Sequence, residues 1–120
     1  MTTPLKWAIE TFGNVAKNRD ERAARLVEEA IELAQAEGVP LDVIERIAHH
    51  VYSKPPGDPI AELQGVALTL DACAENLGDT VQAATWRELV RVTGRSAATW
   101  KERHDVKVAD GRANLSPVKA

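Results

Sequence analysis

Glycine and proline divide this 120-residue chain into segments of helix length. The clearest breaks are Gly-Val-Pro at 38–40, the proline-rich run at 55–59, and Gly78. Glycine readily ends a helix, and proline cannot continue one from its interior. Between the breaks, Ala, Leu, Val, Glu and Arg abound, and apolar residues recur at helical spacing. Together with an aromatic content of only 4%, this pattern predicts an all-α fold, a bundle of four to five helices.

The breaks and the apolar periodicity locate the individual helices. We expect Asp58 to cap the helix that begins at Pro59, because proline is well tolerated at the first helical position. Gly94 should weaken the last helix by about 1 kcal/mol. The expected helices are 4–12, about 18–37, 41–52, 59–77, and a long one from about 79 that extends toward residue 100.

Beyond about Asp105 the helical pattern ends, in a stretch that contains Gly111, Asn114 and Pro117. We therefore expect one helical domain over residues 1–104 and an extended or flexible tail over 105–120. With 44% hydrophobic residues, a chain of this length can form one core but not two.

Charge and cysteine content exclude several classes of function. The formal net charge is −3, which gives no overall attraction for a nucleic-acid polymer or an anionic membrane. No apolar run approaches the length of a membrane span, and the N-terminus has no secretory signal pattern. Cys73 is the only cysteine, so an intramolecular disulfide is impossible. We expect a protein of the reducing cytoplasm.

Three carboxylates lie close together in the helical run at 25–34. At about 100° per residue, Glu28, Glu32 and Glu29 follow one another within roughly a quarter of the helix circumference. Glu29 and Glu32 are separated by one turn and can reach a single divalent cation. Taken alone, this pattern favours an ordinary solvated helix face, with Arg25 pairing Glu29.

A further carboxylate, Glu62, lies at the edge of the apolar stripe of the helix that begins at Pro59. A carboxylate facing a buried seam is costly unless it is paired, reaches solvent or binds a metal ion. Carboxylates aimed at one gap from two helices repel each other unless cations lie between them. This reasoning predicts a magnesium site formed by Glu29, Glu32 and Glu62, with Glu28 either a ligand or one step removed from the metal.

The pattern Glu28-Glu29-x-x-Glu32, followed by Glu62 near the start of another helix, resembles the all-alpha nucleoside triphosphate pyrophosphohydrolases of the MazG-like superfamily. A branch found in phages is more similar still. The resemblance spans about residues 7 to 92. The other shared motifs are Trp7 with Phe12-Gly13, Glu21-Arg22, Arg25, Ser53-Lys54-Pro55-x-Gly57-Asp58-Pro59, and Glu62-Leu63-x-Gly65-Val66 with Thr69-Leu70.

The resemblance implies an enzyme that hydrolyses a nucleoside triphosphate between the α and β phosphates. The products would be a monophosphate and pyrophosphate, and the phage branch favours a purine deoxynucleotide such as dGTP. The implied cofactor is Mg²⁺, with Mn²⁺ able to replace it, at Glu28, Glu29, Glu32 and Glu62. The implied assembly is a homodimer or homotetramer, acting in the cytoplasm or, for a phage-encoded chain, in that of the host.

One position departs from the family pattern. The family's second motif is Glu-x-x-Asp, whereas here Gly65 occupies the last position and offers no side-chain ligand. Asp71 does not replace it, because it lies about 180° around the helix from Glu62. The phage branch also carries glycine there, which indicates a variant site.

Six further residues are candidates for binding the substrate. Basic side chains can neutralise a triphosphate, although surface arginines and lysines are usually only solvated. Aromatic rings and an amide can stack on a base and recognise its edge, with core packing an equal alternative for the rings. The basic candidates are Lys54, Arg91 and Arg95, and the base-binding candidates are Trp7, Phe12 and Asn14.

The competing interpretation is a non-catalytic helical oligomerisation or regulatory module. In that case the glutamates form a solvated face or salt bridges. Independently of this choice, Trp86 and Trp100, on a helix too long for a small monomeric core, indicate a subunit interface, in agreement with the assembly that the resemblance implies.

Overall fold

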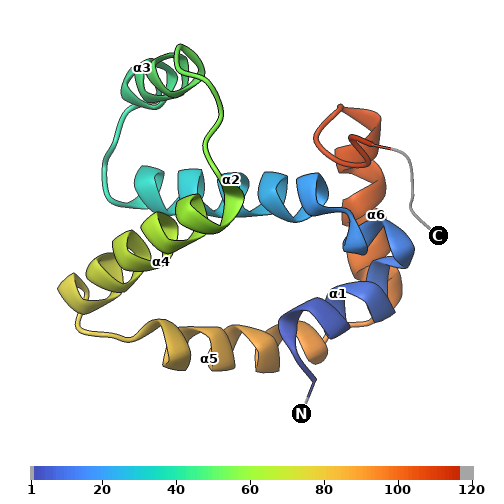
Figure 1. The fold of residues 1–120 in the computed structure, drawn as a ribbon. Helices are drawn as coiled ribbons and strands as arrows, with labels where there is room; N and C mark the ends of the chain where they lie inside the picture. Colours follow the sequence, from blue (N-terminus) through green and yellow to red (C-terminus); the bar gives the residue numbers. More distant parts are fainter. Residues whose placement is uncertain (1, 117–120) are drawn as a thin grey trace. The chain divides into compact units, whose positions relative to one another are not determined.

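The computed structural model describes residues 2–116 and is all helical over this range (Figure 1). The all-α prediction is therefore confirmed for the described residues. Each boundary up to residue 77 lies within one or two positions of its expected place. The elements are α1 (Pro4–Phe12), the 3-10 helix η1 (Asn14–Lys17), α2 (Arg19–Ala36), α3 (Leu41–Tyr52), α4 (Pro59–Asn76), α5 (Val81–Thr93) and α6 (Ala97–Ala109).

Side chains at the helix starts satisfy backbone N–H groups that have no partner within the helix. Thr3 caps α1 by accepting from the backbone N–H of Lys6 at 3.2 Å. Asp58 caps α4 by accepting from the N–H of Ala61 at 3.0 Å, as predicted, and Pro59 is the first helical residue. These starts are set by local chemistry.

The expected long last helix is two helices, because the chain breaks between α5 and α6. Gly94 follows the last residue of α5, where a residue without a β-carbon favours leaving the helix. Ser96 then begins a new helix, and its hydroxyl accepts from the backbone N–H of Thr99 at 3.3 Å. A serine cap two residues after a glycine thus adds a helix boundary that the apolar spacing alone did not indicate.

The described chain forms two compact units. One unit comprises residues 2–39 together with 93–116, and the other comprises Pro40–Val92. The first unit is built from α1, η1, α2 and α6. Its buried apolar residues are small, and the largest fully buried side chains are polar, namely Asn18 and Glu21. The buried apolar residues of this unit are Ala8, Val15, Ala16 and Ala113.

The residues after α6 are held against the beginning of α2. We call residues 110–116 the C-terminal strap. The backbone N–H of Asn114 donates to the Glu21 carboxyl at 2.8 Å, and the Ser116 hydroxyl donates to Asp20 at 3.0 Å. Asn114 has a positive φ of 55°, a conformation that asparagine tolerates better than most residues.

The sequence pattern predicted an extended or flexible tail from about Asp105. Instead, α6 continues to Ala109, and the strap is bonded to α2. The strap is attached to α2 by hydrogen bonds and has no repeating apolar face. Apolar periodicity in the sequence therefore does not indicate that these residues are ordered. Residues 117–120 of the expected tail lie outside the described residues.

The second unit has long helices with little buried surface. No residue of α3 or α4 is buried, and the buried residues of α5 are Leu89 and Val92. On α4 and at its C-cap Leu77, apolar residues recur at alternating intervals of three and four positions, and all of them are exposed: Leu63, Val66, Leu70, Cys73 and Leu77. This spacing makes a continuous apolar stripe along one side of the helix, which we call the α4 stripe. Within the described part of the chain, no helix is both long enough and apolar enough to cross a membrane.

The buried carboxyl of Glu21 should contribute strongly to stability. Replacing Glu21 by Met removes the acceptor of the Asn114 N–H and should lower the free energy of unfolding by about 1–3 kcal/mol, measured by urea denaturation. Glu10→Met on exposed α1 is the matched control and should change stability far less. Equal losses in both variants would contradict the role of Glu21.

Candidate functional site

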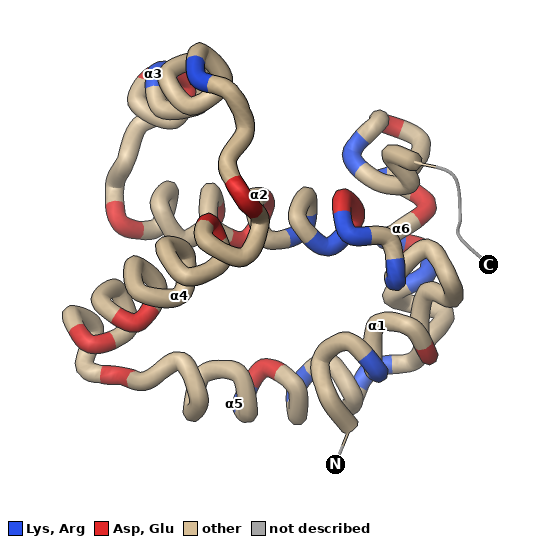
Figure 2. Tube along the Cα trace, viewed as in Figure 1, with Lys and Arg blue, Asp and Glu red and all other residues tan. Residues whose placement is uncertain are grey.

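Figure 2 shows acidic residues along both α2 and α4, each helix in its own unit. On α2, Glu28, Glu29 and Glu32 follow the predicted helical spacing, because α2 runs without interruption from Arg19 to Ala36. Glu29 and Glu32 are exposed, whereas Glu28 is partly buried. Of the three glutamate side chains on this side of α2, one is therefore partly shielded from solvent and two are open to it.

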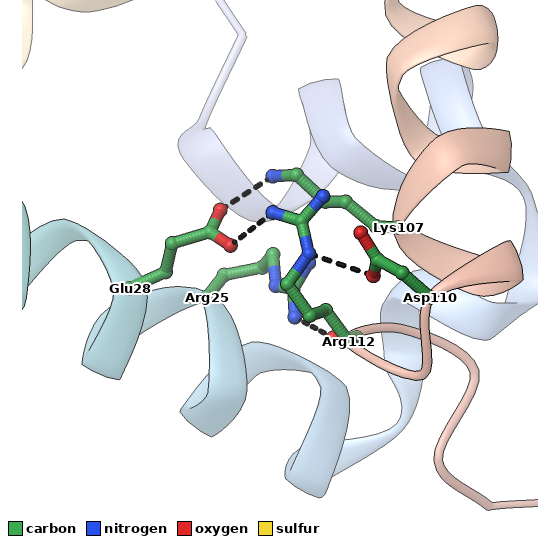
Figure 3. Close-up of polar contacts among 5 residues, drawn as sticks. All are labelled: Arg25, Glu28, Lys107, Asp110 and Arg112. Carbon is green, nitrogen blue, oxygen red and sulfur yellow. Dashed lines mark hydrogen bonds and ion pairs between the residues drawn. The ribbon is translucent and has the colours of Figure 1, made fainter.

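Glu28 is paired with two cations of the same unit (Figure 3). Lys107 of α6 lies 2.7 Å from Oε1, and Arg112 of the strap donates to Oε2 at 3.1 Å. The Glu28 side chain is only 22% exposed, so these ion pairs are partly shielded from solvent. Both carboxylate oxygens are thus occupied.

The two cations change the titration of Glu28. The hydrogen bond from Lys107 is the main cause that lowers the pKa of Glu28 below its ordinary value. Partial burial opposes this shift, while the charges of Lys107 and Arg25 and the hydrogen bond from Arg112 add to it. The net effect favours the ionised form of Glu28.

Arg112 connects Glu28 to a wider charged group, drawn in Figure 3. Its Nε donates to Asp110 at 2.7 Å, and this hydrogen bond lowers the pKa of Asp110 and raises that of Arg112. Arg25 of α2 donates to the backbone carbonyl of Arg112. Two other N–H groups of Arg25, on Nε and Nη1, are buried without a hydrogen-bond partner in the described chain. Three basic side chains, Arg25, Lys107 and Arg112, therefore gather around Glu28.

In the second unit, Glu62 lies in the first turn of α4, as predicted. Its carboxyl folds back over the loop before the helix, so that a β-carbon on Gly57 would lie 2.6 Å from Glu62 Oε1. A side chain at position 57 would require the flexible Glu62 carboxylate to move away from this loop. A β-carbon at Gly65 would meet no atom within 4 Å, so there is open space for a larger side chain at this position.

The proposed base-binding rings pack on one another in the first unit. Trp7 lies edge-on to Phe12 and to Trp100, each with ring centroids 5.7 Å apart. Phe12 also lies 5.2 Å from the ring of His104. The rings are half-buried, and Asn14 is exposed at the first position of η1. Aromatic packing thus joins α1 to α6 and leaves part of each ring surface accessible.

The three basic candidates have different surroundings, each within its own unit. Arg91 forms a bidentate pair with Glu88 on α5, at 2.5 and 2.7 Å. Arg95 lies over the ring of Trp100, 5.3 Å from its centroid, in the other unit. Lys54 is exposed in the loop after α3.

The donor chemistry of Glu29, Glu32 and Glu62 suits a hard divalent cation, because all three offer carboxylate oxygens. Glu29 and Glu32 belong to the first unit and Glu62 to the second. Among residues 2–116, no group of three or more His, Cys, Asp or Glu side chains is placed to hold a metal ion. The predicted metal site would therefore need carboxylates from both units.

Sequence reasoning missed the partners of Glu28. Lys107 and Arg112 lie in the stretch expected to be an unstructured tail, and neither has a spacing that links it to α2. The pair Glu28 and Arg112 is separated by 84 positions in the chain. The basic character of 107–112 was the only available signal.

Comparison of the chain with protein-family models, with curated proteins and with solved structures found no match. The resemblance to the pyrophosphohydrolases therefore depends on the sequence motifs alone.

The ion pairs of Glu28 predict a pH-dependent contribution to stability. Because folding lowers its pKa, the carboxylate stabilises the fold above its ordinary pKa of 4.5, and this is lost as pH falls through the folded-state value. The difference in unfolding free energy between the wild type and Glu28→Gln should thus be large at pH 7 and shrink below pH 4.5. Urea denaturation across this range measures it. The exposed control Glu45→Gln should show no such pH-dependent difference.

Proposed function

We propose that this protein is a magnesium-dependent nucleoside triphosphate pyrophosphohydrolase that converts a (d)NTP and water into the (d)NMP and pyrophosphate. The observation that carries the proposal is the set of acidic motifs at helix positions. Glu28-Glu29-x-x-Glu32 forms one edge of the uninterrupted helix α2. Glu62 occupies the first turn of α4, directly after the Gly57-Asp58-Pro59 loop that caps it. A purine deoxynucleotide such as dGTP is the favoured substrate, by analogy with the phage branch.

In this proposal, Glu29, Glu32 and Glu62 hold the metal, which requires the two units, of one chain or of neighbouring subunits, to bring them together. A metal ion held by these three carboxylates would supply charge neutralisation for the phosphates and activation of the attacking water. Glu28 serves to orient that water or to accept its proton. No covalent intermediate is needed.

Other side chains would bind the remainder of the nucleotide. Trp7 and Phe12 offer partly exposed ring surface for stacking, and Asn14 offers an exposed amide to a base edge. Three cations are assigned to the phosphates in this scheme: Lys54, Arg91 and Arg95.

The exposed α4 stripe supports the proposed homodimer or homotetramer. An 18-residue helix without a single buried residue leaves its apolar side chains in water. The three-and-four spacing of the stripe is the pattern by which two helices pack along a common seam. A second copy of the chain supplies an identical stripe and so offers a matching surface.

One observation favours the non-catalytic alternative. Glu28 forms salt bridges with Lys107 and Arg112, which is the arrangement expected if the glutamates of α2 serve structure. Under this alternative the protein is a helical oligomerisation or regulatory module.

Incubation with each nucleoside triphosphate and Mg²⁺, followed by chromatography, separates these functions. We expect a monophosphate and pyrophosphate, and removal of the metal by a chelator should stop the reaction. Diphosphate with orthophosphate would show cleavage at a different bond. No turnover of any nucleotide would favour the module.

Two substitutions test the metal ligands. Glu32→Gln and Glu62→Gln should each reduce turnover by about 100-fold or more, because each removes a charged ligand while preserving side-chain size. The circular dichroism of both variants should remain helical. Glu37→Gln after α2 and Glu75→Gln near the end of α4 are matched controls and should retain activity. Near-normal rates in either ligand variant would refute its assignment.

The α4 stripe predicts a specific effect on assembly. Leu70→Glu places a charge in the middle of the stripe and should dissociate the oligomer toward monomer, as measured by sedimentation velocity. Leu68→Glu is the matched control, because Leu68 lies about 160° away on the same helix and is 75% exposed. If the wild type is monomeric, or if both variants associate alike, the stripe is not the interface.

A further inference from the structure

The proposed reaction assigns no role to two basic side chains near Glu28, Lys107 and Arg112. Both remain accessible, with side chains that are 26% and 46% exposed. Both lie on the Glu28 side of α2, and the separation of Glu28 from Glu32 by four residues puts Glu32 one turn further along that side. A phosphate chain bound near these carboxylates would therefore lie within reach of Lys107 and Arg112.

The present partners of Glu28 are incompatible with a metal ion on the same carboxylate. Lys107 and Arg112 lie at 2.7 and 3.1 Å from its two oxygens. A divalent cation bound to either oxygen would lie roughly 2 Å from it, close to both positive charges, and would be repelled by them. If Glu28 is to act on metal or water, the two cations need another anion to neutralise them.

The chemistry of the cluster suits a phosphate anion. The planar fork of arginine matches two phosphate oxygens, and lysine supplies a compact charge beside it. The two buried N–H groups of Arg25 that lack an acceptor add positive charge next to Arg112. A triphosphate carries several negative charges, whereas the present partners, Glu28 and Asp110, carry one each.

We propose that Lys107 and Arg112 form a phosphate-binding site that exchanges partners: they hold Glu28 in the absence of ligand and bind the phosphate chain when it arrives, which frees Glu28. The identification of that chain as part of a nucleoside triphosphate rests on the proposed function. The site itself rests on the ion pairs within the first unit.

The test uses inorganic triphosphate without metal as the probe, measured by titration calorimetry. Wild-type protein should bind it, and Lys107→Met and Arg112→Met should each weaken binding by about tenfold, the usual effect of losing one charged hydrogen bond. Arg46→Met is the matched control, because Arg46 forms an exposed pair with Asp42 at 3.0 Å on α3. Thermal denaturation establishes that each variant is folded.

A second measurement separates phosphate binding from a purely structural role. Mn²⁺ binding without nucleotide, followed by electron paramagnetic resonance, should be as tight or tighter in Lys107→Met, because Glu28 loses a competing cation. If this variant bound both Mn²⁺ and triphosphate more weakly, Lys107 would serve only to hold α6 on α2, and the proposal would be wrong.

Failure of this proposal is distinguishable from failure of the proposed function. If wild-type protein binds triphosphate through Lys107 and Arg112 but hydrolyses no nucleotide, the site stands and the enzymatic function falls. If nucleotides are hydrolysed but triphosphate binds equally well to wild type and both variants, or does not bind to wild type, the phosphate site is refuted.

Discussion

The first unit depends on one buried contact, in which the Glu21 carboxyl accepts the backbone N–H of Asn114. Glu21 is 1% exposed, so this acceptor is sheltered from water and has no solvent alternative. The contact fixes the C-terminal strap on the first turns of α2, and the strap in turn brings Arg112 to Glu28. The position of Arg112 in the charged cluster thus depends on the hydrogen bond that the backbone of Asn114, two residues further along the chain, makes to Glu21.

The two units achieve stability by different means. The first has a small apolar core of alanine and valine, supplemented by buried polar groups and ion pairs. The second has long amphipathic helices whose apolar side chains are largely exposed. Hydrogen bonds and ion pairs are directional and specify one arrangement of the helices. Burial of exposed apolar side chains is not directional, so many complementary surfaces can cover them. The second unit is therefore the part whose packing would change most under the proposed association.

Local chemistry explains what could be predicted from the sequence. Asp58 with Pro59 and Gly38 with Pro40 act over a few residues, so the ends of α2, α3 and α4 follow from them. The break at Gly94 was underestimated, because the cap by Ser96 adds to the weakness of the glycine. The pairing of Glu28 with Arg112 could not be predicted, since it joins residues 84 positions apart through a strap without periodicity. The spacing of the three glutamates on α2 can be recognised in the sequence. The pairing of Glu28 with two basic side chains cannot.

The first unit is discontinuous, and this affects how the chain folds as it is made. Residues 2–39 leave the ribosome first, yet α6 and the strap that complete their unit come only after Pro40–Val92. Until the strap has been synthesised, the Glu21 carboxylate is hydrated by water. The N-terminal segment therefore carries no buried, unpaired carboxylate before Asn114 is available. The middle helices, by contrast, emerge with their apolar stripes uncovered. This interval in translation is when the nascent chain is most exposed to chaperones and to premature association.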